Sequence, residues 1–233
     1  SRLDLLVSLA EAIEYDNQAR GPADTTVILL GDLVDRGPDS AGVIKAVRMW
    51  SQMRQMRFIL GNHEEMFLES FSDLETLRPF LKYGGRETLL SYPIDPITYS
   101  AAELGEVQEL MFDAVPREDL EFLASFEDSI IKGDYLFVHA GIQPGVPLGD
   151  QRTAHLRWIR EPFLSHAGDH GYIVVHGHSI MSEAEVLANR IGIDTGAYET
   201  GKLTALGLEG PDRWLIETRD DDGAISTVTR RAS

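Results

Sequence analysis

The sequence predicts an α/β fold, because its two halves carry different patterns. In the first half, short apolar runs at residues 26–30 and 58–60 each stop at a glycine, and helical patterns follow them. In the second half, apolar runs separated by glycine and aspartate turns succeed one another closely, as in antiparallel sheets. This order predicts two packed mixed β-sheets flanked by helices.

The remaining elements are predicted in order along the chain. Helices are expected at residues 2–15, 39–50 and 64–71, the second of them capped by Asp39 or Ser40. Further strands are expected at residues 134–138, 172–175, 191–194, 203–208, 213–217 and 225–228. We expect a single domain over residues 1–233, with a helical insertion at about 73–127.

Composition narrows the class of protein. The chain has 233 residues, enough for one large α/β domain, and no cysteine, which excludes disulfides and thiolate chemistry. The formal net charge of −17 disfavours nucleic acid and anionic membranes as partners. No apolar run approaches the length of a membrane span. We therefore expect a cytoplasmic protein that binds neither nucleic acid nor membrane.

Four predicted strands end next to side chains that can bind metal ions. These side chains are Asp32, Asn62, His139 and His178. Each one alone has an ordinary explanation, since a Gly-Asp turn is common and a histidine at a strand end is more often packed in a core. Their shared position at the carboxyl ends of strands, where open α/β sheets bind ligands, favours a site for divalent metal.

The motifs around these residues resemble those of the phosphoprotein-phosphatase family of calcineurin-like metallophosphoesterases. The resemblance is to its bacterial and phage serine/threonine phosphatase branch. It covers nearly the whole chain and rests on the segments at residues 31–37, 61–64, 139–141, 156–160, 177–179 and 193–197. It implies a four-layer metallophosphoesterase fold and a metal-dependent phosphatase.

The resemblance also implies roles for the metal ligands. Asp32 would bridge two divalent ions, and Asn62, His139 and His178 would complete the second site. Manganese is the expected metal, with iron or zinc as the other possibilities. Two ions bridged by one carboxylate can activate a hydroxide and clamp the phosphoryl oxygens.

Four further residues complete the expected site. His63 would protonate the leaving oxygen, and Asp35 would pair with His63 and hold its tautomer. Arg36 and Arg160 would bind phosphate oxygens. Two simpler explanations stay open: Asp35 and Arg36 could form an ion pair in a turn, and Arg160 could be a surface arginine. His176 could be a further ligand, although a packed strand histidine is favoured.

One family motif does not occur in the sequence. Relatives open with Gly-Asp-x-His-Gly, which supplies two ligands of the first metal and follows the first strand. Residues 2–6 resemble the segment that comes directly after that motif. Two explanations compete: the motif and the first strand precede Ser1 in the natural protein, or the protein lacks them and Asp32 chiefly holds the first metal. We favour the first, because the remaining catalytic positions are all in place.

Three functions compete. The leading hypothesis is hydrolysis of phosphomonoesters as a serine/threonine protein phosphatase, and the alternative is symmetrical hydrolysis of dinucleoside polyphosphates such as diadenosine tetraphosphate. Relatives with the second activity tend to carry alanine at the position of Asp35 and aspartate at that of Glu64, which favours the phosphatase. The third hypothesis is a non-catalytic module that binds phosphate or protein.

Overall fold

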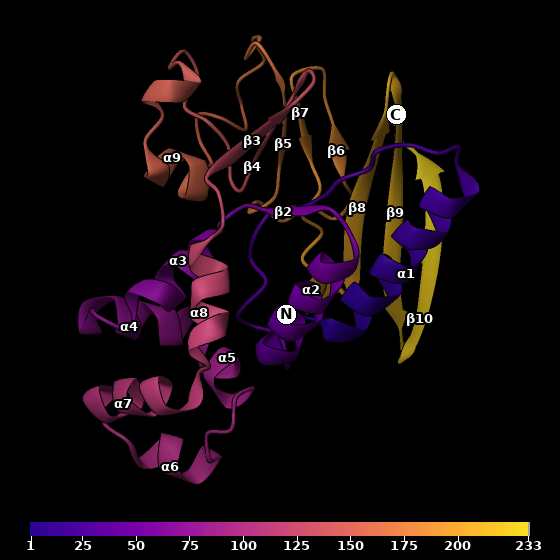
Figure 1. The fold of residues 1–233 in the computed structure, drawn as a ribbon. Helices are drawn as coiled ribbons and strands as arrows, with labels where there is room; N and C mark the ends of the chain where they lie inside the picture. Colours follow the sequence, from indigo (N-terminus) through magenta and orange to yellow (C-terminus); the bar gives the residue numbers. More distant parts are fainter. Residues whose placement is uncertain (233) are drawn as a thin grey trace. The chain divides into compact units, whose positions relative to one another are not determined.

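The structure, a computed structural model, describes residues 1–232 (Figure 1). The chain divides into two compact units. Unit 1 comprises Ser1–Leu3 and Val27–Glu127, and unit 2 comprises Asp4–Thr26 and the chain from Asp128 onward. The single domain that the sequence predicts for residues 1–233 stays a prediction.

The sheet of unit 1 is small and parallel. Its strands are β1 (Val27–Leu29) and β2 (Met56–Phe58), joined by α2 (Ser40–Met53). The predicted cap Asp39 accepts a hydrogen bond from the backbone of Gly42 at 2.8 Å. Strand β2 begins two residues before the predicted strand and ends at Phe58. The Ile59 amide still donates to the Leu29 carbonyl at 2.9 Å, and the Leu60 amide donates to the Glu127 carbonyl at 2.9 Å.

Helices make up the rest of unit 1, as the sequence predicts for residues 73–127. They are α3 (Asn62–Glu69), α4 (Leu74–Phe80), the π-helical turn η1 (Leu81–Gly85), α5 (Arg86–Leu90), α6 (Pro96–Ala101), α7 (Leu104–Ala114) and α8 (Arg117–Ala124). Contacts between phenylalanine rings link them: Phe67 and Phe80 stack at 5.4 Å, and Phe58 and Phe122 meet edge to face at 5.0 Å. These contacts bury the apolar helix faces against one another and against β2.

Unit 2 contains a mixed five-stranded sheet in the order β3-β4-β5-β7-β6. Its strands are β3 (Ser129–Lys132), β4 (Tyr135–Val138), β5 (Ile173–His176), β6 (Glu185–Val186) and β7 (Arg190–Gly192). The three central strands are parallel, and the two edge strands are antiparallel to their neighbours. The sequence predicted neither edge strand, and β7, expected among antiparallel strands, pairs in parallel with β5.

The core of unit 2 lies on this sheet. Short helices η2 (Leu148–Asp150), α9 (Thr153–Trp158) and α10 (Ala197–Thr200) follow its strands. Buried side chains from β4, β5 and α9 pack together with Phe163, which has no exposed surface. The carboxyl ends of β4 and β5 are therefore fixed by a continuous apolar cluster.

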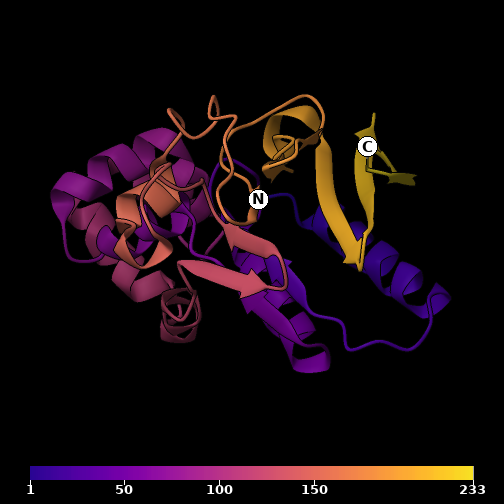
Figure 2. The same ribbon diagram turned by 90° about the horizontal axis from the view of Figure 1, so that it is seen from above.

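A three-stranded antiparallel sheet completes unit 2. It is formed by β8 (Lys202–Glu209), β9 (Asp212–Asp221) and β10 (Ala224–Arg231) in the order β10-β9-β8. Helix α1 (Leu3–Ala19) lies beside this sheet in both views (Figures 1 and 2). The Thr218 hydroxyl donates to the Leu5 carbonyl at 3.2 Å, and the Trp214 indole donates to Asp16 at 3.1 Å.

The predicted α/β class is confirmed, and the predicted helix at residues 2–15 is α1. Within the described residues the strands form three hydrogen-bonded sheets, where the sequence predicted two. The difference is the pair β1 and β2, which forms a separate two-stranded sheet. No helix among residues 1–232 is long and apolar enough to cross a bilayer.

Candidate active site

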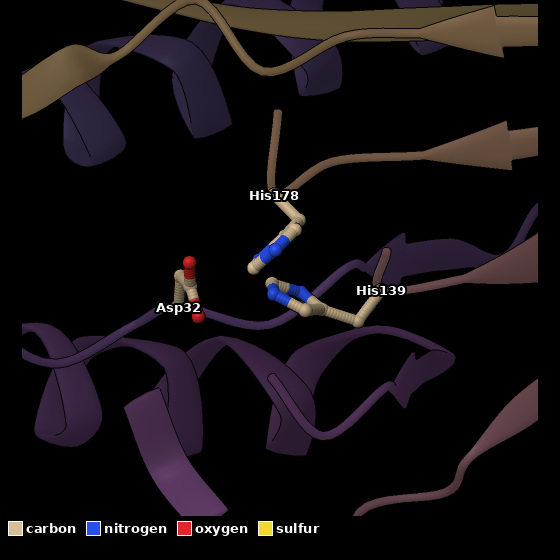
Figure 3. Close-up of side chains that lie close together, drawn as sticks. All are labelled: Asp32, His139 and His178. Carbon is tan, nitrogen blue, oxygen red and sulfur yellow. The ribbon is translucent and has the colours of Figure 1, made fainter. Parts of the chain in front are cut away.

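The two predicted histidine ligands lie next to each other in unit 2. His139 follows β4 directly and His178 comes two residues after β5, and these parallel strands are neighbours in the sheet. Both side chains are buried, and their rings meet edge to face with centroids 5.2 Å apart. Figure 3 shows the two imidazoles pointing toward one another. The sheet topology therefore brings together residues that are 39 positions apart in the chain.

The backbone fixes this arrangement. The Gly177 amide donates to the His139 carbonyl at 2.8 Å, which ties the two strand ends together. His178 adopts a left-handed conformation with φ of 62°. A non-glycine residue there is strained by about 1–3 kcal/mol and persists only where surrounding structure imposes it.

Helix α9 places Trp158 near this strand end. The Ala140 amide donates to the Leu156 carbonyl at 2.8 Å, joining the helix to the His139 loop. The Trp158 ring is 40% exposed and lies 6.4 Å from the His178 ring. Arg160 is exposed two residues further on. Both explanations of Arg160, phosphate ligand or surface arginine, therefore stay open.

His176 is packed in the core of unit 2. Its ring is fully buried, meets Phe163 edge to face at 5.0 Å, and its Nδ1 lies 3.1 Å from the Gly177 carbonyl. Burial lowers the pKa of His176 to about 4, so the ring is neutral. These contacts favour the packed strand histidine over a further metal ligand.

In unit 1, Asp32 lies on the turn after β1, and Glu64 holds that turn. The Glu64 carboxylate is fully buried and accepts four backbone hydrogen bonds. Its Oε1 accepts from Leu33 at 2.6 Å and Val34 at 3.2 Å, and its Oε2 accepts from Asp32 at 2.8 Å and Gly61 at 3.0 Å. The sequence did not indicate this role, because Glu64 looks like an ordinary residue of a helix start.

Backbone strain gathers at the predicted site residues. Among the described residues, five that are not glycine have positive φ. Four of them are predicted site residues: Asp32 at 57°, Asp35 at 71°, Arg36 at 63° and His178 at 62°. The fifth, Asp222, lies in the tight turn between β9 and β10. Such outliers cluster at functional sites, which supports a function for these segments.

Asp35 and His63 form a buried pair in unit 1. His63 Nδ1 lies 2.5 Å from Asp35 Oδ2, and both side chains are at most 5% exposed. Burial alone lowers the pKa of His63, but the hydrogen bond to Asp35 and the charges of Asp32 and Asp35 outweigh it and raise that pKa. The pairing with Asp35 therefore favours the protonated form of His63, as a general acid requires.

Two hydroxyls that sequence inspection missed contact this pair. The Thr88 hydroxyl donates to Asp35 Oδ1 at 2.7 Å, and the Ser40 hydroxyl lies 2.9 Å from that of Thr88. In the sequence Ser40 stood out only as a possible helix cap, and Thr88, 53 positions from Asp35, was not singled out. Only the folded structure places them together.

The segment before α5 holds Arg36. The Arg36 amide donates to the Gly84 carbonyl at 3.2 Å, and its Nε donates to the Tyr83 carbonyl at 3.3 Å. A Cβ on Gly84, whose φ is 118°, would lie 2.7 Å from the Arg36 nitrogen. The close approach therefore requires glycine at this position.

The residues present fit a divalent metal ion. Unit 1 offers the carboxylate of Asp32, and unit 2 offers the two neighbouring imidazoles of His139 and His178, each labelled in Figure 3. Asn62, the first residue of α3, adds an amide oxygen and is 4% exposed. Oxygen and imidazole together suit manganese, iron or zinc.

The chain belongs to the calcineurin-like phosphoesterase family, whose profile matches residues 3–205. Membership confirms the predicted family and the predicted class of enzyme, a metal-dependent phosphoester hydrolase.

Curated relatives divide between two activities. A symmetrical bis(5'-nucleosyl)-tetraphosphatase of Ralstonia nicotianae is 30% identical over 87% of this chain, which spans 62% of the relative's length. An asymmetrical bis(5'-nucleosyl)-tetraphosphatase of Bacillus velezensis is 25% identical, covering 91% of this chain and 86% of the relative. Serine/threonine-protein phosphatase 1 of Salmonella typhimurium is 29% identical, covering 81% of each chain.

A solved structure supports the fold. A crystal structure of a protein provisionally named a diadenosine tetraphosphatase matches with a TM-score of 0.59 at 17% identity. The match covers 97% of this chain and 87% of the other. At this identity the likeness concerns the fold alone.

Proposed function

We propose that the protein hydrolyses phosphomonoesters of serine and threonine side chains, with His63 protonating the leaving oxygen. The observation that carries the proposal is the buried pair of Asp35 and His63. An alkoxide leaving group is strongly basic and needs a proton as the P–O bond breaks. A phosphate leaving group, as in a dinucleoside polyphosphate, is already a weak base and needs no such acid.

We propose that Asp32, Asn62, His139 and His178 hold divalent metal, with manganese the expected ion. Bound metal would supply an activated water and positive charge against the phosphoryl oxygens. Arg36, and Arg160 in the same role, would orient the phosphoryl group through their planar guanidinium groups. We also propose a cytoplasmic location, with which the absence of cysteine is compatible.

Hydrolysis of bis(5'-nucleosyl) tetraphosphates is the second candidate. The relatives from Ralstonia nicotianae and Bacillus velezensis, which carry that name, support it. Asp35 and Glu64 count in favour of the phosphatase, because relatives that cleave dinucleotides tend to carry alanine and aspartate there. The named relatives and these two residues therefore favour different substrates.

The deciding experiment compares leaving groups. On the natural full-length protein with manganese, His63→Asn should lower kcat for a phosphothreonine peptide by about 10²–10⁴-fold and change it far less for 4-nitrophenyl phosphate. His155→Asn, a histidine given no role, serves as the matched control. An equal loss on both substrates would contradict the acid role. Faster wild-type turnover of diadenosine tetraphosphate than of the peptide would favour the second candidate.

A further inference from the structure

We propose that Thr88 is a positioning residue that fixes the Asp35 carboxylate so that it holds His63 in the orientation needed for proton transfer. The inference rests on the proposed function, because it concerns the same acid. Thr88 lies on α5 and contacts Asp35 rather than His63 or the predicted metal ligands. It therefore acts through Asp35 and is not itself catalytic.

The Thr88 hydroxyl uses its full hydrogen-bonding capacity within unit 1. It donates to Asp35 Oδ1 at 2.7 Å and accepts from the Asp35 amide at 2.8 Å. The Ser40 hydroxyl, 2.9 Å away, then donates to the remaining lone pair. The side chains of Thr88 and Ser40 have no exposed surface. A fully satisfied buried network of this kind specifies one orientation of its members.

The two carboxylate oxygens of Asp35 have different partners. Oδ1 bonds to Thr88, and Oδ2 bonds to His63 Nδ1 at 2.5 Å. With both oxygens held, rotation about the bond to the carboxyl group is suppressed, and the imidazole keeps a single tautomer. Without Thr88, Oδ1 would be a buried acceptor without this donor, and the carboxylate would be free to turn toward other donors.

Local strain makes this support necessary. Asp35 has a φ of 71°, a conformation that side chains other than glycine adopt at a cost of about 1–3 kcal/mol. Thr88 bonds both the amide and the carboxylate of Asp35, so one hydroxyl fixes the strained backbone and the side chain together. Tyr83 and Gly84, which come shortly before Thr88 in the chain, accept hydrogen bonds from Arg36, the residue directly after Asp35. One short segment thus holds two consecutive residues of the predicted site.

The test uses the isosteric variant Thr88→Val and the rescue variant Thr88→Ser in the full-length protein with manganese. Valine removes the hydroxyl but leaves the Asp35 amide its second acceptor, Ser40, at 3.1 Å. Thr88→Val loses one hydrogen bond to a charged group, which should lower kcat for a phosphothreonine peptide by about 10–100-fold. Turnover of 4-nitrophenyl phosphate should change far less, and serine should restore most of the activity on the peptide.

A second readout does not depend on turnover. In the metal-free protein, the Nδ1 proton of His63 should give a downfield resonance in the wild type and in Thr88→Ser. Loss or a large shift of that resonance is expected in Thr88→Val. Ser70→Ala, which removes another fully buried hydroxyl from the same unit, is the control that should leave both readouts unchanged.

The outcomes separate the inference from the proposed function. Equal losses of kcat on both substrates, or unchanged peptide turnover with an unchanged resonance, would overturn the positioning role. If His63→Asn shows the selective loss and Thr88→Val does not, only the inference about Thr88 fails. If His63→Asn shows no selective loss, both fail. Should Thr88→Val not fold, Thr88→Ala with the same pair of substrates decides.

Discussion

Replacing Glu64 by glutamine should destabilise the turn that carries Asp32 without changing the shape of the side chain. Glu64 accepts hydrogen bonds from four backbone amides, two at each carboxylate oxygen. Glutamine keeps one oxygen, so two of the four amides would face an NH₂ group that cannot accept. The substitution therefore leaves two buried donors unsatisfied, whichever way the amide is oriented.

The magnitude follows from those contacts. A buried donor that loses its acceptor costs about 1–3 kcal/mol, so two such donors cost about 2–6 kcal/mol. Domains of this kind have unfolding free energies of about 5–15 kcal/mol, so the loss is a large fraction of the total. In either orientation the weakened amides include one of the turn, that of Asp32 or those of Leu33 and Val34 directly after it, so the affinity for metal should fall together with stability.

Urea denaturation followed by circular dichroism measures the change in unfolding free energy, and calorimetric titration with manganese measures the change in affinity. Glu109→Gln is the matched control, since Glu109 is an exposed glutamate on a helix of the same unit. A Glu64→Gln variant within about 0.5 kcal/mol of the wild type would refute the reasoning, since that is the range of ordinary surface substitutions.

Three further predictions concern other residues. Asp32→Asn should lower the manganese bound per chain, measured by elemental analysis, whereas exposed Asp24→Asn should not. Gly84→Ala should raise KM for phosphoesters and lower the unfolding free energy by about 1–3 kcal/mol, because the alanine Cβ would meet Arg36. The control Gly105→Ala, which has open space around the new Cβ, should change neither quantity in that way. Burial alone raises the pKa of Glu217, but Arg230 and Lys202 outweigh it and lower that pKa. The ionised Glu217 carboxylate therefore stabilises the folded state above about pH 4.3, and this stabilisation is lost as the pH falls. Glu217→Gln should therefore lower stability at neutral pH and flatten the acid limb of an unfolding midpoint measured against pH.

The sequence predicted the elements that periodicity can detect. Helix α1, the helices within residues 73–127 and the strands around Leu136 and Val174 all have strong apolar patterns and occur as predicted. Strands β3 and β6 were missed because one is short and half exposed and the other has two residues. The parallel pairing of β7 was missed because its direction is set by the connection from β5 to β7, which spans residues 177–189 and includes β6, and not by the strand itself.

The candidate site was predictable only where polar residues follow apolar strands. That rule found Asp32, His139 and His178, since strand ends are visible in the sequence. It could not find Thr88 or the role of Glu64. Both lie in helices where a polar residue looks ordinary, and their importance comes from backbone groups that only the fold brings near.

Those two residues explain how the strained turn persists. Asp32, Asp35 and Arg36 all have left-handed backbones, at a cost of about 1–2 kcal/mol each for residues with a Cβ. Local preference therefore opposes the turn, and hydrogen bonds from elsewhere must impose it. Glu64 from α3 binds the amides of the first part of the turn, and Thr88 from α5 binds Asp35. Because the geometry of Asp32 and Asp35 depends on these distant buried groups, substitutions on α3 and α5 should disturb the site before they disturb the sheet.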